Sequence, residues 1–261
     1  MRIALVSLNQ VWENKEENFL TCRSYVQSAK VQDVELVIFP EMTLTAFSMN
    51  TEVTAEDSSC SLTVDSFKKL AEEFQVAIIF GVVFRDNEKA TNNAILVDKT
   101  GSVKDSYRKI HPFSFTGEDK LFDGGNKISF SKIGQINIGL TICYDLRFPE
   151  IYSALGRSCE LIINIANWPA RRVEHWNSLL KARAIENQLF IVGVNRTGTD
   201  GMGLAYVKSS QAINPNGDLL IPVIFNEYLD IFDIDPEYIV QFKKTFSTTQ
   251  DRKHVLYKSI L

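Results

Sequence analysis

The chain has 261 residues, of which 45% are hydrophobic and 23% are charged, and its formal net charge is −4. This mild acidity gives no electrostatic reason to expect a nucleic acid partner, since such binding needs a basic patch. No apolar run approaches the roughly 18–20 residues that a membrane-spanning helix needs, so no membrane partner is expected. The N-terminal stretch MRIALVSLNQ has little positive charge and no small-residue cleavage site. It is typical of a first strand rather than a signal peptide, which predicts a cytoplasmic protein.

Short apolar runs alternate with amphipathic stretches in the first half of the chain. The apolar residues of the amphipathic stretches recur at helical spacing, whereas the short runs have the length and composition of strands. The helices expected here are 14–30 and 63–75. The strands expected here, with turn signals between the last three, are 3–8, 34–40, 76–84, 93–103 and 105–109.

The second half continues the alternation and adds a hairpin. Strands are expected at 136–143, 161–167 and 190–195, and helices at 149–157 and 172–188. The stretch 213–223 has a hairpin signal at Asn216-Gly217, and 236–246 is typical of a last helix followed by an extended arm. Alternating strands and helices mixed with hairpins predict one α/β domain over residues 1–261, with mixed sheets under helical layers.

The four cysteines are far apart, with no CxxC pair and no histidine beside them at ligand spacing. A zinc site is therefore not expected. A chain of this size without a signal peptide favours reduced thiols, most of which should be packing residues. They are Cys22, Cys60, Cys143 and Cys159.

Three strand-like runs end at residues that can carry chemistry: Glu41, Lys109 and Cys143. In open α/β sheets, ligands gather beyond the carboxyl ends of the strands. Strand alternation places Cys143 on the same face as Thr141 and Gly139, where small side chains leave room for a ligand. Polar residues at strand ends are also common simply because strands end near solvent. Periodicity alone therefore leaves both interpretations open.

Several segments together resemble the carbon–nitrogen hydrolase family, also called the nitrilase superfamily. FPEMTLTAF, YRKIHPF and LTICYDLRFPE resemble its three signature segments, in the family's order of Glu, Lys and Cys. The likeness continues through ANWPARR, HWNSLLKARAIENQ, NRTGTDG and INPNGDL, and so covers almost the whole chain. A single segment would be weak evidence, but the ordered set is specific.

The resemblance implies a four-layer αββα sandwich of two mixed sheets, paired through its helical face into a homodimer or higher homo-oligomer. It implies that Cys143 is the nucleophile, that Glu41 is the general base, and that Lys109 faces the oxyanion together with a backbone N–H near Tyr144. Glu118 lies at the place of a fourth acidic residue that orients substrate and water. A thiol with an ordinary pKa of about 8.5 is mostly protonated at neutral pH, so it needs such a base. No metal or organic cofactor is implied.

A Cys–His pair is the rival use of the same thiol. His111 belongs to the matching KIHPF segment and is expected to shape a loop, while His175, on an amphipathic helix, is expected to pack or cap. His254 lies in the tail. Because the chain has few histidines, we rank a Cys–His dyad below the Glu–Lys–Cys arrangement.

Two further residues are candidates for substrate binding. Trp168 follows the strand 161–167 and is expected to form a wall of the pocket, although packing would also suit a tryptophan. Arg172 is the candidate for a substrate carboxylate, because arginine favours bidentate pairing. Arg171 and Arg147 are its rivals.

Within the family, CYDLRFPE together with WPARR and KARAIENQ is most similar to the ω-amidase branch. That branch hydrolyses the terminal amide of small 2-oxo dicarboxylic monoamides, such as 2-oxoglutaramate, to the 2-oxo acid and ammonia. The alternatives with the same catalytic residues are deaminated-glutathione amidase, N-carbamoyl amide hydrolase, nitrilase and an acyltransferase. A different class, a non-catalytic binding protein on the same fold, is disfavoured because Glu41, Lys109 and Cys143 are all present.

Overall fold

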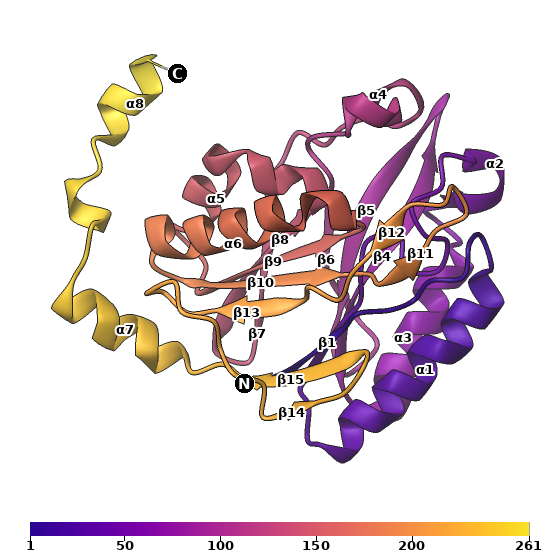
Figure 1. Cartoon of the computed structure of the whole chain (residues 1–261), viewed down its shortest axis with the longest axis horizontal. Coiled ribbons are helices and arrows are strands. Elements are labelled where there is room, and N and C mark those ends of the chain that lie inside the picture. Colours follow the sequence, from indigo (N-terminus) through magenta and orange to yellow (C-terminus); the bar gives the residue numbers. More distant parts are fainter. Residues whose placement is uncertain (261) are drawn as a thin grey trace.

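Two β-sheets pack face to face in the computed structural model, and helices cover the outer face of each sheet (Figure 1). The structure describes residues 1–260, except for the side chains of Thr249, His254, Lys258 and Ile260. No helix in this described part is both long and apolar enough to cross a membrane.

The larger sheet has the strand order β14-β15-β1-β2-β4-β5-β6, with β3 paired to β4. It is mixed, because β1, β2 and β4 run parallel while β15 and β5 pair with them in antiparallel fashion. Its strands are β1 (Arg2–Val6), β2 (Leu36–Ile38), β3 (Glu56–Asp57), β4 (Ala77–Asp86), β5 (Lys89–Val97), β6 (Val103–Arg108), β14 (Ile224–Phe225) and β15 (Leu229–Asp233).

The second sheet has the order β13-β10-β9-β8-β7 and is also mixed, with β8, β9 and β10 parallel. Its strands are β7 (Phe130–Ile133), β8 (Ile136–Ile142), β9 (Leu161–Ala166), β10 (Phe190–Asn195) and β13 (Gln211–Ile213). A separate small ribbon pairs β11 (Gly198–Thr199) with β12 (Ala205–Tyr206).

Alternation along the strands divides the apolar side chains between two cores. In β1, Ala4 and Val6 pack against the helical layer, whereas Ile3 and Leu5 face the second sheet. The helices over the larger sheet are α1 (Lys15–Val31) and α3 (Leu62–Phe74); those over the second sheet are α5 (Pro149–Leu155) and α6 (Val173–Asn187). Side-chain caps begin α1 at Asn14 and α3 at Ser61. The expected α/β fold with two mixed sheets and four layers is thus confirmed.

Shorter helical turns connect these layers. The α-helical ones are α2 (Thr51–Thr54) and α4 (Glu118–Leu121), and the 3₁₀ turns are η1 (Ser114–Thr116), η2 (Cys143–Arg147) and η3 (Ala170–Arg172). The C-terminal segment contains α7 (Pro236–Thr245), η4 (Thr249–Asp251) and α8 (His254–Ile260), and it extends away from the sandwich as an arm (Figure 1).

Most of the expected elements agree with the structure to within a few residues. The helix at 236–246 was expected to be the last, followed by an extended arm, but the helical elements η4 and α8 follow it, and the strand expected at 93–103 ends at Val97 before a turn. The strand expected through Cys143 ends at Ile142, because Cys143 begins a 3₁₀ turn with a left-handed φ of 46°. Strand alternation therefore does not set the direction of the thiol, and the predicted shared face with Thr141 and Gly139 is wrong. Strand β7, at an edge of the second sheet, and strand β15, between β14 and β1 in the larger sheet, were not expected. The hairpin at Asn216-Gly217 is confirmed, with Gly217 at a φ of 87°.

One glycine lets two segments near the site approach closely. A Cβ on Gly81 of β4 would lie 2.3 Å from the backbone nitrogen of Met42, immediately after Glu41. Gly81 also exchanges hydrogen bonds with Thr43 through its N–H and its carbonyl. The absence of a side chain at Gly81 therefore lets the Glu41 loop lie flat against β4.

Candidate active site

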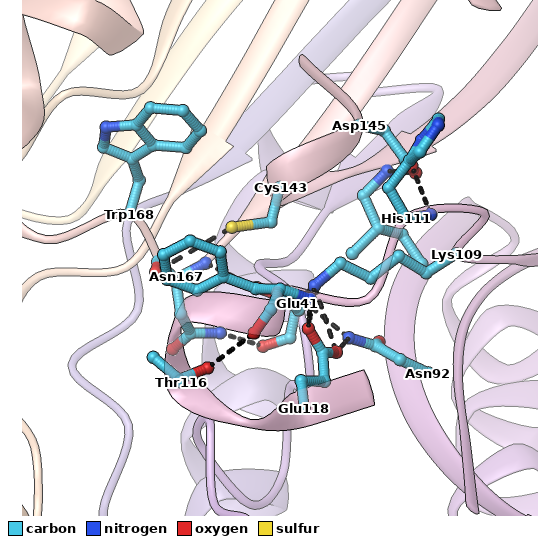
Figure 2. A network of polar contacts seen from close by, with 12 residues as sticks. Glu41, Asn92, Lys109, His111, Thr116, Glu118, Cys143, Asp145, Asn167 and Trp168 are labelled. Atoms are coloured by element: carbon cyan, nitrogen blue, oxygen red, sulfur yellow. Dashed lines mark hydrogen bonds and ion pairs between the residues drawn. The ribbon is translucent and has the colours of Figure 1, made fainter. Parts of the chain in front are cut away.

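Glu41, Lys109 and Cys143 meet where strands of the two sheets end, as the family resemblance implied. Glu41 follows β2, Lys109 follows β6 directly, and Cys143 follows β8. Glu118, the first residue of α4, joins them (Figure 2). Glu41, Lys109 and Glu118 are each at most 1% exposed, so they form a cluster of charges that is removed from water.

Lys109 joins the two carboxylates. Its Nζ lies 3.0 Å from Oε1 of Glu41, and 3.1 and 2.8 Å from Oε1 and Oε2 of Glu118. Burial by itself lowers the pKa of Lys109, but the negative charges of Glu118 and Glu41 outweigh it and hold the pKa of the ammonium above its usual range. Lys109 is therefore a permanent cation in this site. Its Nζ also lies 5.3 Å from the ring centre of Phe47.

Further N–H groups complete the hydrogen bonding of the carboxylates. The side-chain amide of Asn92 donates to Oε1 of Glu41 at 2.7 Å and to Oε1 of Glu118 at 3.1 Å. The backbone N–H of Asn167 donates to Oε2 of Glu41 at 2.9 Å, and that of Phe113 to Oε2 of Glu118 at 2.5 Å. When Lys109 is counted with these donors, Oε1 of Glu41 and both carboxylate oxygens of Glu118 each accept two hydrogen bonds from described residues. Oε2 of Glu41 accepts one.

Cys143 is held in a strained backbone conformation. Its φ of 46° lies in the left-handed region, which is unfavourable for a residue with a side chain. The buried carboxylate of Asp145 accepts hydrogen bonds from the Ile142 N–H at 3.0 Å and the Tyr107 hydroxyl at 2.7 Å. It also contacts the His111 N–H at 3.0 Å and the His111 Nδ1 at 2.9 Å. Asp145 thereby ties the turn that carries Cys143 to the segment that carries Lys109.

The thiol of Cys143 lies at the edge of the charge cluster and is 9% exposed. Burial is the main reason that its pKa lies well above the usual range, and the negative charge of Glu41 raises it further, while Lys109 acts in the opposite direction. The resting side chain is therefore a neutral thiol. Chemistry at this sulfur requires a base that takes the proton.

A cleft opens beside the thiol and is lined by aromatic and basic side chains. Trp168 lines it, as predicted, together with Tyr144, Phe47, Phe113 and Tyr206. Trp168 also packs on Trp176, at 5.5 Å between ring centres, and its Nε1 donates to the carbonyl of Arg172. Both uses considered for Trp168, pocket wall and packing group, thus apply at once.

Arg147, Arg171 and Arg172 all line the same cleft. The guanidinium of Arg172 lies over the ring of Phe113 at 5.3 Å, and that of Arg147 lies over Trp168 at 4.9 Å. None of the carboxylates described in the structure lies within 4.0 Å of these three groups, in contrast to the many arginines elsewhere that are paired with acids. Burial, then the charges of Arg171 and Arg147, lower the pKa of Arg172. A cluster of like charges without counterions favours an anionic ligand.

Among the described side chains, the other histidines and cysteines form no hydrogen bond with Glu41, Lys109, Glu118 or Cys143. His111 pairs with Asp145 and stacks on Phe148, which agrees with its expected role in shaping a loop. His175 is exposed and contacts Arg147, so the expected packing role is wrong. The side chain of His254 lies outside the described part. Cys159 is buried, and burial raises its pKa to about 12, which makes it a poor nucleophile. In the described residues, no group of three His, Cys, Asp or Glu side chains could hold a metal ion.

Three residues of the site were missed by the sequence analysis: Asn92, Asp145 and Asn167. Asn92 lies in the stretch TNNAILV, between two other polar residues and just before an apolar run. Asn167 is the last residue of the expected strand 161–167, next to Trp168, and Asp145 lies two residues after Cys143. Polar residues at these strand ends were the available signal, but which partners they would meet depends on the pairing of strands.

Comparison with known proteins identifies related chains along nearly the full length. The family described as carbon-nitrogen hydrolase matches residues 2–244. The chain is 33% identical over 239 residues to the "Hydrolase in agr operon" of Staphylococcus aureus, covering 90% of each protein. It is 32% identical over 220 residues to "Omega-amidase YafV" of Escherichia coli strain K12, covering 84% of each. Its fold matches XC1258 of Xanthomonas campestris, a CN-hydrolase superfamily protein with an arsenic adduct in its active site, with a TM-score of 0.90, 28% identity and 97% coverage of both chains.

Lys109→Met is expected to lower the free energy of unfolding by about 3–5 kcal/mol, because it leaves two buried carboxylates without their cation. Denaturant unfolding measures this loss. Lys109→Met/Glu118→Gln should recover part of it, since one of the facing charges is then removed.

The control is Lys68→Met, which removes an exposed pair with Asp65 and should change the unfolding free energy by less than about 1 kcal/mol. Equal losses for Lys109→Met and Lys68→Met would contradict the ionic cluster.

Proposed function

The chain belongs to the carbon–nitrogen hydrolase family, and we propose that it is an ω-amidase. It hydrolyses the terminal amide of a small 2-oxo dicarboxylic monoamide, such as 2-oxoglutaramate, to the 2-oxo acid and ammonia. The observation that carries this proposal is the cluster of unpaired arginines in the cleft beside Cys143, which suits a carboxylate at the far end of the substrate. The relative named omega-amidase, which is similar over 84% of the chain, supports the same substrate class.

In the proposed reaction, the sulfur of Cys143 attacks the amide carbonyl carbon and its proton passes to Glu41. Oε2 of Glu41 is the receiving atom, because the other three carboxylate oxygens of the cluster each accept two N–H donors. Lys109 and the backbone N–H near Tyr144 stabilise the negative charge that develops on the carbonyl oxygen. One such donor is worth about 3 kcal/mol in the transition state.

Collapse of this intermediate breaks the C–N bond, and the proton on Glu41 passes to the leaving ammonia. The acyl group is then a thioester on Cys143. A water molecule attacks the thioester carbon, with Glu41 taking the water proton and Glu118 orienting the substrate and the water. The sulfur leaves, takes back a proton and restores the thiol, and the released product carries a second carboxylate.

Cys143→Ala is expected to abolish ammonia release while leaving the fold intact, because it removes the nucleophile and only one heavy atom. Ammonia release and circular dichroism measure the two properties. The matched control is a variant with Cys22, Cys60 and Cys159 all replaced by Ser or Ala, which should remain active. Full activity of Cys143→Ala, or a folded but inactive triple variant, would show that the nucleophile is misassigned.

Arg172→Met is expected to reduce kcat/KM for 2-oxoglutaramate by about 30-fold or more, mostly through KM, since stranding one member of a desolvated charge pair costs at least about 2 kcal/mol. A neutral amide of similar length should be affected much less. In the wild type, 2-oxoglutaramate should be a better substrate than the neutral amide, a carbamoyl compound or a nitrile.

Equal losses on the charged and neutral amides would mean that Arg172 holds the loop rather than the substrate. Unchanged kinetics on both would direct the same test to Arg171 and Arg147. A wild-type preference for the carbamoyl compound or the nitrile would overturn the proposed substrate class.

A homodimer formed on the α5–α6 face is part of the proposal. The C-terminal arm joins this face through Arg252, which donates to the Ser153 hydroxyl and the Glu186 carbonyl. On the arm, α8 exposes Val255, Leu256 and Tyr257, which are 88%, 53% and 42% exposed. A second copy would cover these apolar side chains.

Light scattering at micromolar concentration should therefore give the mass of a dimer or a higher oligomer. Val255→Glu/Leu256→Glu should shift the mass toward that of a monomer, whereas Val31→Glu, at an exposed apolar position of α1, should not. A monomeric wild type would contradict the proposal.

A further inference from the structure

Asn92 lies directly opposite Lys109 in the pairing of β5 with the end of β6. The last residue pair of the β5–β6 ladder is Asn93 with Arg108, so the next pair along is Asn92 with Lys109. The Lys109 N–H donates to the Asn92 carbonyl at 2.9 Å. Residues directly opposite each other project to the same face of a sheet. The amide of Asn92 therefore reaches the same carboxylates as the ammonium of Lys109 (Figure 2).

We propose that Asn92 is a positioning residue that occupies Oε1 of Glu41 and links it to Glu118, so that Oε2 of Glu41 is left to take the proton of Cys143. This inference rests on the proposed function, because it assigns Glu41 as the base. Asn92 acts through Glu41 and does not itself touch the thiol.

The orientation of the Asn92 amide is determined by its neighbours. Its nitrogen faces two carboxylate oxygens, and the reversed orientation would place an amide oxygen against both of them. The amide oxygen is buried and has no hydrogen-bond partner among the described residues. Burying an amide oxygen without a partner is unfavourable, and an apolar side chain at this position would not have that cost. What Asn92 provides and an apolar residue cannot is the pair of hydrogen bonds donated by its side-chain nitrogen.

The charged and titratable groups that face Glu41 come from three segments. They are Lys109 after β6, Glu118 of α4, and the thiol of Cys143 after β8. With one cation between two carboxylates, the cluster carries surplus negative charge. A hydrogen bond donated to a carboxylate stabilises its negative charge, so the Asn92 amide offsets part of this surplus.

The neighbouring residue provides a matched control. Asn93 lies on the same strand and is also buried, but its amide donates only to the carbonyl and hydroxyl of Thr91. Asn92→Ala and Asn93→Ala thus each remove a buried amide from β5, but only Asn92→Ala removes donors from Glu41 and Glu118.

The test measures the rate at which iodoacetamide alkylates Cys143 across the pH range in which each variant is folded, together with kcat/KM for the amide substrate. The acid limb is the part of each pH profile in which the rate rises with pH. In Asn92→Ala, the acid limbs of the alkylation rate and of kcat/KM should move to higher pH by about one to two units, because the charged form of Glu41 loses a hydrogen bond. The limb of Asn93→Ala should stay at the wild-type pH. Asn92→Asp, which keeps the shape but replaces the donor by an acceptor, should move in the same direction.

An acid limb that stays at the wild-type pH in a folded Asn92 variant overturns the role of Asn92, even if the rate falls. Alkylation needs no substrate, so the two proposals fail separately. If no amide releases ammonia but the alkylation limb moves only in the Asn92 variants, the proposed substrate class fails and the role of Asn92 stands. If ammonia is released and the limb does not move, the role of Asn92 fails and the proposed function stands.

Discussion

The buried ammonium of Lys109 is the interaction on which the site depends. A charge in the protein interior is tolerated only when it is paired and hydrogen-bonded, and Lys109 meets Glu41 from the end of β2 and Glu118 from α4. These contacts bring Glu41, which is 68 residues from Lys109 in the sequence, to the same point as Lys109 and Glu118. Because two carboxylates share one cation, the surplus negative charge needs further N–H donors. Those donors are the amide of Asn92 and the backbone N–H groups of Asn167 and Phe113.

The position of the thiol follows from a second buried carboxylate. Cys143 departs from strand geometry at a φ of 46°, and such a conformation persists only where the surroundings enforce it. Asp145 does so by accepting the N–H of Ile142 on one side and the Tyr107 hydroxyl on the other. Tyr107 lies two residues before Lys109, so the Asp145 side chain links the turn of Cys143 to the segment of Lys109.

The sequence predicted the two mixed sheets and the ends of the strands that carry Glu41, Lys109 and Cys143, because apolar runs stop and polar residues begin there. It could not predict the direction of the thiol, since a left-handed turn breaks the alternation on which that prediction relied. Strand β15 was missed because it pairs with β1 across almost the whole chain, as Arg2 with Asp233. Asn92 was missed for a similar reason, since its partners follow from the register between β5 and β6.

The charges in and beside the cleft also determine how the proposed substrate would be oriented. The buried cluster of Glu41, Lys109 and Glu118 beside Cys143 carries surplus negative charge, whereas Arg147, Arg171 and Arg172 line the cleft. In the proposed reaction, a substrate with one carboxylate and one neutral amide would bind with the amide toward Cys143, because the reverse orientation would bring a third carboxylate to the buried cluster. Hydrolysis converts that inner amide into a carboxylate. The product then faces the repulsion that the substrate avoids, so the arrangement that orients the amide for attack also favours release of the dicarboxylic acid.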